Sequence, residues 1–150
     1  MIKKLPNKDI ERAIALVNEV FSEFVAVDYS EEGRNTFALY LKTKLQELTD
    51  DVKCGHKEMW AYYQEDEIVG VIAMQNISHI SLLFVGKEYH KKGIARQLFL
   101  TALNEVKQSE NPTKITVNSS PYAVEAYEHL GFLKTNDAQE TNGIILEYVL

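Results

Sequence analysis

The sequence predicts a mixed α/β (α+β) fold, in which about four helices cover a mainly antiparallel sheet of six to seven strands. Three observations predict it: an amphipathic stripe near the N-terminus, a series of strand-like runs with short connections, and a strand–turn–helix unit at residues 78–106. A strand follows that helix, so it should lie parallel to the strand at 78–85. Two such central parallel strands, each leading into a helix, can splay apart at their C-terminal ends.

The N-terminal part predicts one short strand and two helices. The strand covers residues 2–5, and Asn7 can cap the first helix. The apolar stripe of that helix, typical of core packing, consists of Ile10, Ala13, Ile14, Val17, Phe21 and Phe24. A second helix is expected over roughly residues 31–48, and the polar stretch 49–56 is expected to be a loop.

The middle of the chain predicts an antiparallel meander. Strands at residues 58–64 and 68–76 are joined by a short acidic turn, and Gly70 is expected at a bulge. The strand at 78–85 then follows after a short connection.

The C-terminal part predicts two helices and three strands. The helix that begins at Gly93 has an apolar face made of Ala95, Leu98, Phe99, Ala102, Leu103 and Val106. A strand at 114–118 leads into a helix that Gly131 ends as a left-handed cap. The last strands are expected at 132–134 and 143–150.

Composition limits the class of protein. A chain of 150 residues ordinarily forms one domain, which we expect to span residues 1–150. The net charge of −6 argues against a nucleic-acid partner, and the single cysteine, Cys54, excludes an internal disulfide. No apolar run reaches the length of a membrane span, and the N-terminus does not resemble a signal peptide. We therefore expect a cytoplasmic protein with no membrane partner.

The turn before Gly93 has the features of an anion site. Backbone N–H groups at a helix start have no internal partner and lie at the positive end of the helix dipole. Gly93 has no Cβ, so a phosphate can approach the backbone, and Lys91 and Lys92 add positive charge. A diphosphate suits such a site. The alternative is a solvated basic turn that caps an ordinary helix, because short glycine motifs are weak signals.

This stretch resembles the acetyl-CoA-binding motif of the GNAT superfamily of N-acetyltransferases, Gln/Arg-x-x-Gly-x-Gly/Ala, with His90 in the first position. Residues 117–132 resemble the later motif of the same family, in which an Asn ends a strand and a helix finishes in Tyr-x-x-Leu-Gly-Phe. Two motifs in the right order and separation are far more specific than one. The resemblance covers residues 60–132 well and the N-terminal third in outline.

The resemblance implies acetyl-CoA as co-substrate, held where the two central strands splay apart. The pantetheine arm would pair with the backbone at residues 83–85. The implied coenzyme-binding residues are Leu83, Phe84, Val85, His90, Lys91, Lys92, Gly93, Ile94, Ala95, Arg96, Asn118 and Tyr127. Asn118 either holds the coenzyme or simply ends its strand. The histidines have no ligand-like spacing, so no metal site is expected.

The implied reaction is direct attack of a primary amine on the thioester within a ternary complex. Tyr127 matches the motif tyrosine and is the candidate acid for the departing thiolate, with a plain core aromatic as the alternative. His79, eleven residues before His90, is the candidate base, and the alternative is a histidine satisfied on a strand face. Ser81, two residues further on, should share that face and could orient a water.

The acceptor is expected to be a small-molecule amine or a peptide amine. In this family the first two helices and their connection shape the acceptor pocket, so the recognition candidates here are Phe24, Asp28, Tyr29, Glu32 and Tyr40. Exposed strand edges are compatible with a homodimer. A different class of function, an acyl-CoA-binding or regulatory module without turnover, is the alternative.

Overall fold

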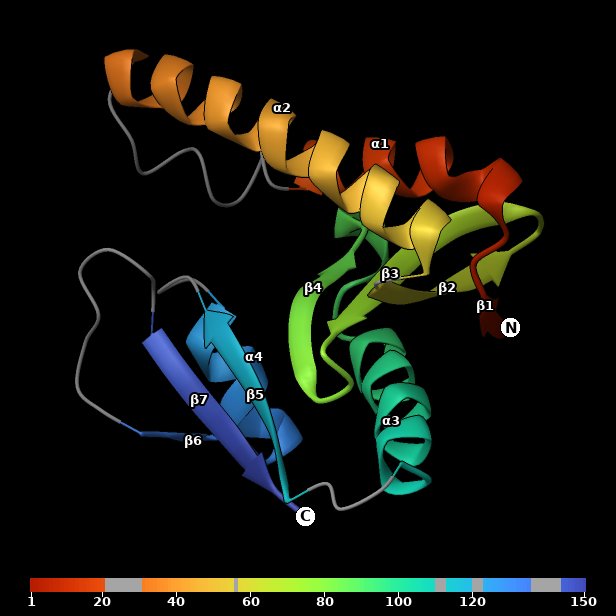
Figure 1. The fold of residues 1–150 in the computed structure, drawn as a ribbon, viewed down its shortest axis with the longest axis vertical. Helices are drawn as coiled ribbons and strands as arrows, with labels where there is room; N and C mark the ends of the chain where they lie inside the picture. The colour runs from red at the N-terminus through yellow and green to blue at the C-terminus, as the bar shows by residue number, and fades with distance from the viewer. Residues whose placement is uncertain (21–30, 56, 110–112, 120–122, 136–143) are drawn as a thin grey trace.

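The computed structural model describes residues 1–20, 31–55, 57–109, 113–119, 123–135 and 144–150. Within them a seven-stranded sheet has the order β1-β2-β3-β4-β5-β7-β6 (Figure 1). The strands are β1 Ile2–Lys4, β2 Lys57–Gln64, β3 Glu67–Gln75, β4 His79–Val85, β5 Lys114–Ser119, β6 Leu133–Lys134 and β7 Ile144–Val149. The helices are α1 Ile10–Val20, α2 Glu31–Cys54, α3 Ile94–Lys107 and α4 Val124–Leu130, with short 3-10 helices η1 Asn7–Asp9 and η4 Lys87–Tyr89. The predicted mixed, mainly antiparallel fold is confirmed.

The two central strands are parallel and separate soon after they pair. β1 to β4 form an antiparallel meander, and β5, β7 and β6 form a second antiparallel group. The two groups are joined by β4 and β5, whose register pairs are His79 with Thr116 and Ile80 with Val117. Beyond these pairs the strands diverge (Figure 1), which confirms the predicted splay.

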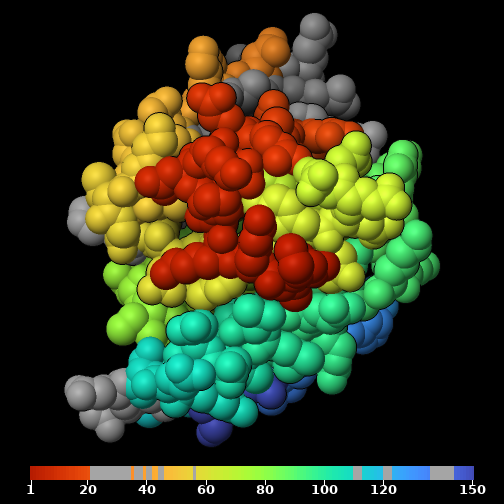
Figure 2. Space-filling model, turned by 90° about the vertical axis from the view of Figure 1, so that its right-hand side faces the viewer, coloured from red at the N-terminus to blue at the C-terminus, as the bar shows by residue number. Residues whose placement is uncertain are grey.

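The sheet buries both of its faces. Under α3 and α4 the core contains large side chains such as Trp60, Ile80, Phe99 and Phe132. Under α1 and α2 a smaller core contains Leu5, Ile10, Val17, Leu48, Met59 and Val71. Seen from the β1 edge, the N-terminal residues lie between α2 and α3 (Figure 2). No helix in the described ranges is both long enough and apolar enough to cross a membrane.

The second helix is longer than predicted, because the stretch expected to be a loop at 49–56 continues α2 to Cys54. Val52 packs against the core under α1 and α2, and Asp51 pairs with Lys57 Nζ at 3.3 Å. These tertiary contacts stabilise the polar C-terminal end of α2, which periodicity alone assigns to a loop. Gly55, with φ +83°, ends the helix.

Two irregularities shape the meander. Tyr62 pairs with Gly70 and Tyr63 with Ile68, so the extra residue lies directly before Gly70, where a bulge was predicted. A Cβ on Gly70 would lie 3.1 Å from side-chain atoms of α3, so glycine also permits the helix to pack closely. In β4 the bulged residue is Ser81, because the neighbouring register pairs join Ala73 to Leu82 and Met74 to Ile80.

Candidate active site

The backbone between β4 and α3 is shaped like an anion-binding turn. His90 is extended, Lys91 has φ +62° and Gly93 has φ +80°. Gly93 is the N-cap of α3 and provides no side-chain cap, so the first N–H groups of the helix have no partner from it. A Cβ added to Gly93 would meet nothing within 4 Å. Glycine is therefore favoured here by the left-handed backbone, and the space in front of the helix is open.

The side chain of His90 ties this turn to the end of β4. Its Nε2 lies 2.7 Å from the carbonyl oxygen of Val85. Because a carbonyl only accepts, Nε2 carries a hydrogen and donates it. The residue that departs from the family motif thus makes a contact within the loop.

Cationic side chains surround the same helix start. Lys91, Lys92 and Arg96 are all exposed, and Lys92 Nζ lies 5.6 Å from the centre of the Tyr89 ring. Together with the helix dipole they make the surroundings favourable for a phosphate.

Within the part of the chain that the structure describes, β4 has no strand partner on one side beyond Ile80. On the other side, Leu83 pairs with Ile72, Phe84 with Val71 and Val85 with Gly70 of β3. On the β5 side, the register pairs within the described residues end at Ile80. The stretch 81–85 therefore has no partner strand on this side within the described residues, although the Val85 carbonyl already accepts the hydrogen bond from His90. Backbone of this kind can pair with an extended ligand that has amide groups.

Tyr127, on α4, is a member of the core under α3 and α4. It is 7% exposed, and its ring packs edge-on against Phe132 with 5.6 Å between ring centres. An ordinary phenol already keeps its proton at neutral pH, and burial raises the pKa of the Tyr127 hydroxyl further. The core position of Tyr127 is thus clear, and its role as an acid stays a prediction.

His79 is half-buried at the start of β4. Its Nδ1 lies 2.8 Å from Thr116 Oγ1 on β5, and the described residues give its Nε2 no hydrogen-bond partner. Burial, and secondly the positive charge of Lys57, lower the pKa of His79. The imidazole is therefore neutral at pH 7, the form that can accept a proton.

The remaining predicted residues fall into two groups. Asn118 is exposed on β5, one pair beyond the last contact with β4, and the Ser81 hydroxyl donates to Gln75 Oε1 at 3.3 Å. The acceptor candidates Phe24, Asp28 and Tyr29 lie outside the described residues, as do the side chains of Glu32 and Tyr40.

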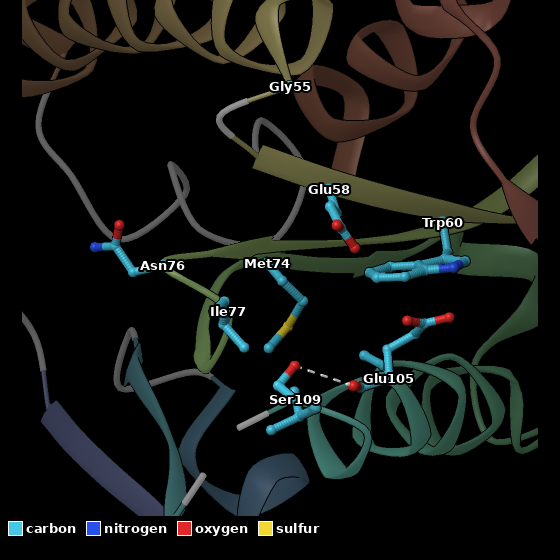
Figure 3. A pocket seen from close by; sticks show the side chains of 10 residues that line it. Gly55, Glu58, Trp60, Met74, Asn76, Ile77, Glu105 and Ser109 are labelled. Carbon is cyan, nitrogen blue, oxygen red and sulfur yellow. Dashed lines mark hydrogen bonds between the residues drawn. The ribbon is translucent and has the colours of Figure 1, made fainter. Parts of the chain in front are cut away.

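A separate cavity of about 200 Å³ lies between the sheet and the C-terminal half of α3. Figure 3 shows the carboxylates of Glu58 and Glu105 near the Trp60 ring, with Met74 and Ile77 beside them. The start of α3 at Gly93 is at the opposite end of that helix, so this cavity is distinct from the splay. No pattern in the sequence predicted this cavity.

Thr116 and Lys57 were not among the predicted site residues. Each lies in a strand at some distance along the chain, and only the sheet register places them near His79, through the pairs Lys57–Gln75, Gln75–His79 and His79–Thr116. Nothing in the local sequence marks either residue.

Comparisons with known proteins define the class. Residues 25–147 match the family model described as an acetyltransferase (GNAT) domain. The chain is 31% identical over 116 residues to UPF0039 protein C11D3.02c of Schizosaccharomyces pombe, which covers 73% of this chain and 76% of that protein. The chain therefore belongs to the GNAT family of acetyltransferases and is an acyltransferase.

Two further similarities are more limited. The chain is 27% identical over 105 residues to UPF0157 protein YqkA of Bacillus subtilis, covering 68% of this chain and only 31% of that protein, so it spans under a third of YqkA. The crystal structure of the PaiA N-acetyltransferase from Thermoplasma acidophilum in complex with coenzyme A matches with a TM-score of 0.79 at 19% identity. That match covers 100% of this chain and 98% of the other, and it shows a shared fold.

Proposed function

We propose that residues 1–150 form a single GNAT domain that transfers the acetyl group of acetyl-CoA to a primary amine by direct attack in a ternary complex. One observation carries the proposal. The unpaired side of β4 at 81–85 leads directly to the open start of α3 at Gly93. A coenzyme with an amide-bearing arm and a diphosphate fits a path of free backbone groups that ends at a helix N-terminus.

The residues of this path divide between the two parts of the coenzyme. The backbone of Leu83, Phe84 and Val85 would pair with the pantetheine arm, and the exposed amide of Asn118 on β5 would contact it. The diphosphate would bind at the turn and the first residues of α3. His90 would also stabilise the turn through its hydrogen bond to the Val85 carbonyl. The residues proposed to hold the diphosphate are His90, Lys91, Lys92, Gly93, Ile94, Ala95 and Arg96.

Acetyl-CoA supplies the activated thioester, and the chain supplies the proton transfers. Tyr127, whose phenol is protonated at neutral pH, would donate its phenolic proton to the departing sulfur. His79, neutral at pH 7, would take the proton of the amine at Nε2, directly or through a water that Ser81 orients. No metal is invoked.

The acceptor is an amine, as in the family. We propose that Phe24 and Tyr29, in the segment between α1 and α2, contribute to its recognition, together with Ser81. A panel of primary amines, from small amines to peptide N-termini, incubated with acetyl-CoA and monitored by thiol release, identifies the class of acceptor.

The sharpest test of the proposed mechanism is Tyr127→Phe. We expect unchanged coenzyme affinity and turnover lowered at least about tenfold, because a general acid is lost while the ring packing remains. Tyr148→Phe is the matched control, since Tyr148 belongs to the same aromatic cluster, 5.1 Å from Phe99 between ring centres. Equal turnover in parent and Tyr127→Phe would remove Tyr127 from the mechanism. Coenzyme binding without release of thiol from any amine would favour a non-catalytic acyl-CoA-binding module.

A further inference from the structure

The structure points to a role for Thr116, which rests on the proposed function of His79 as base. We propose that Thr116 is a positioning residue: its hydroxyl oxygen accepts a hydrogen bond from Nδ1–H of His79 and so leaves the lone pair of Nε2 to receive the proton of the amine.

The contact is held by the sheet itself. Nδ1 of His79 and Oγ1 of Thr116 are 2.8 Å apart, a short hydrogen bond. The two residues are register partners at the start of the parallel pair, and the Thr116 backbone N–H donates to the Ser78 carbonyl at 3.0 Å. Because both groups lie on rigid strands, the orientation of the imidazole is set without a loop.

The position of the pair in the sheet would also allow the substrate amine to reach the imidazole. Ile80, Ile115 and Val117 are buried under α3 and α4. His79 and Thr116 alternate with them along their strands and therefore point to the opposite face. The strands separate directly after Ile80 and Val117, so the ring stands at the base of the splay.

The direction of the hydrogen bond decides whether His79 can act. If Nδ1 donates, Nε2 has a free lone pair, and the bond persists when the ring becomes an imidazolium. If the hydroxyl donates instead, Nε2 carries the hydrogen and no free lone pair remains. A fixed Nδ1–H therefore means that the ring need not reorganise when it takes a proton.

The charges around the pair favour the first direction. Glu147 on β7 is the register partner of Thr116, so its carboxylate lies on the same face and attracts the hydroxyl hydrogen toward β7. Lys114 Nζ lies 2.9 Å from that carboxylate. From β2, Lys57 faces His79 across Gln75 and is paired with Asp51 at the end of α2. A cation on that side disfavours a second proton on the ring and keeps it neutral.

The tautomer is measured directly by long-range ¹H–¹⁵N correlation on ¹⁵N-histidine-labelled protein without coenzyme. We expect His79 to carry its hydrogen on Nδ1 in the parent and to become a mixture in Thr116→Val, which keeps the shape and loses the hydroxyl. A parent ring with its hydrogen on Nε2, or an unchanged tautomer in Thr116→Val, would overturn the proposal. This measurement needs no turnover, so it tests the role of Thr116 separately from the proposed function. Failure of the proposed role of His79 as base would instead appear as full activity in His79→Ala.

Kinetics give the second readout. We expect Thr116→Val to lower kcat about tenfold at unchanged coenzyme affinity, and to move the acidic limb of the kcat profile to lower pH, because the lost bond stabilises the imidazolium more than the neutral ring. Thr116→Ser should restore both. Thr101→Val is the matched control, since the Thr101 hydroxyl donates to the Gln97 carbonyl on α3. A Thr116→Val profile identical to the parent would contradict the role, whatever its stability.

Discussion

Single residues at the splay act through charge and backbone conformation. Lys57 lies two register steps from His79, and its charge is the second cause, after burial, of the lowered pKa of that imidazole. In the proposed mechanism, the charge of Lys57 thus helps to keep His79 neutral beside the path that would hold the coenzyme.

Replacing Lys57 by Met should raise the pKa of His79, because the charge that disfavours the imidazolium is removed. The acidic limb of kcat/KM should therefore move to higher pH, and an NMR titration of His79 should move in the same direction. Lys53→Met, at the exposed end of α2, is the control. Coincident titration curves for parent and Lys57→Met would show that Lys57 does not act on His79.

Gly93 allows a direct test of the phosphate site, because the chain contains a matched glycine. Gly93 and Gly55 have φ of +80° and +83°, and a Cβ at either would meet nothing within 4 Å. Glu at each position should impose the same backbone strain, about 1–2 kcal/mol. Only Gly93→Glu should abolish coenzyme binding in calorimetry, through bulk and like charge. Retained affinity in Gly93→Glu would mean that the diphosphate binds elsewhere.

At the scale of elements, one polar cluster connects η1 and the start of α1 to strand β2 of the sheet. Asp9 in η1 is 6% exposed, and its Oδ2 accepts a hydrogen bond of 2.6 Å from the Tyr63 hydroxyl of β2. Arg12 Nη1 lies 3.2 Å from Asp9 Oδ1, and Arg12 also donates to the Asp66 carbonyl. The Tyr63 bond, and then Arg12, hold the pKa of Asp9 below its ordinary value, while burial and the bond to Asp9 raise the pKa of Tyr63 to about 12.

Tyr63→Phe should therefore lower the melting temperature by a few degrees at pH 7. Since the pKa of Asp9 is depressed in the folded protein, the stability it contributes is present above about pH 4, the unfolded value, and is lost as pH falls through the folded pKa. The difference between parent and variant should shrink when scans are repeated at decreasing pH. Tyr62→Phe, on the preceding residue, is the control. A difference independent of pH would assign the effect to packing.

At the scale of the whole molecule, the short parallel pairing of β4 with β5 connects the two antiparallel groups of strands. We predict that coenzyme binding lowers hydrogen exchange at residues 81–85 and 93–96, where free backbone groups would become bonded, and leaves β2 unchanged. Protection around Trp60 and Ile77 instead would indicate that the coenzyme occupies the cavity beside the C-terminal half of α3.

The features that the sequence predicted best are those encoded in neighbouring residues. Apolar periodicity identified the faces of α1 and α3, and a left-handed glycine was expected where a helix ends at Gly131. At Gly93 the sequence predicted only a helix start without a side chain, and the structure added the positive φ. The path from β4 to the open helix start follows from the same contiguous stretch, because strand, turn and helix preferences act over a few residues.

The tertiary structure alone decided which distant residues meet. α2 continues to Cys54 because Val52 finds a core to pack against, and the hydroxyl partner of His79 lies 37 residues away on a parallel strand. Register between such strands depends on how the whole sheet buries its two faces, so no local pattern contains it. Amino-acid order by itself thus determined the order of the elements and the glycine-containing turn before α3, whereas the end of α2 and the surroundings of His79 were decided only by tertiary contacts.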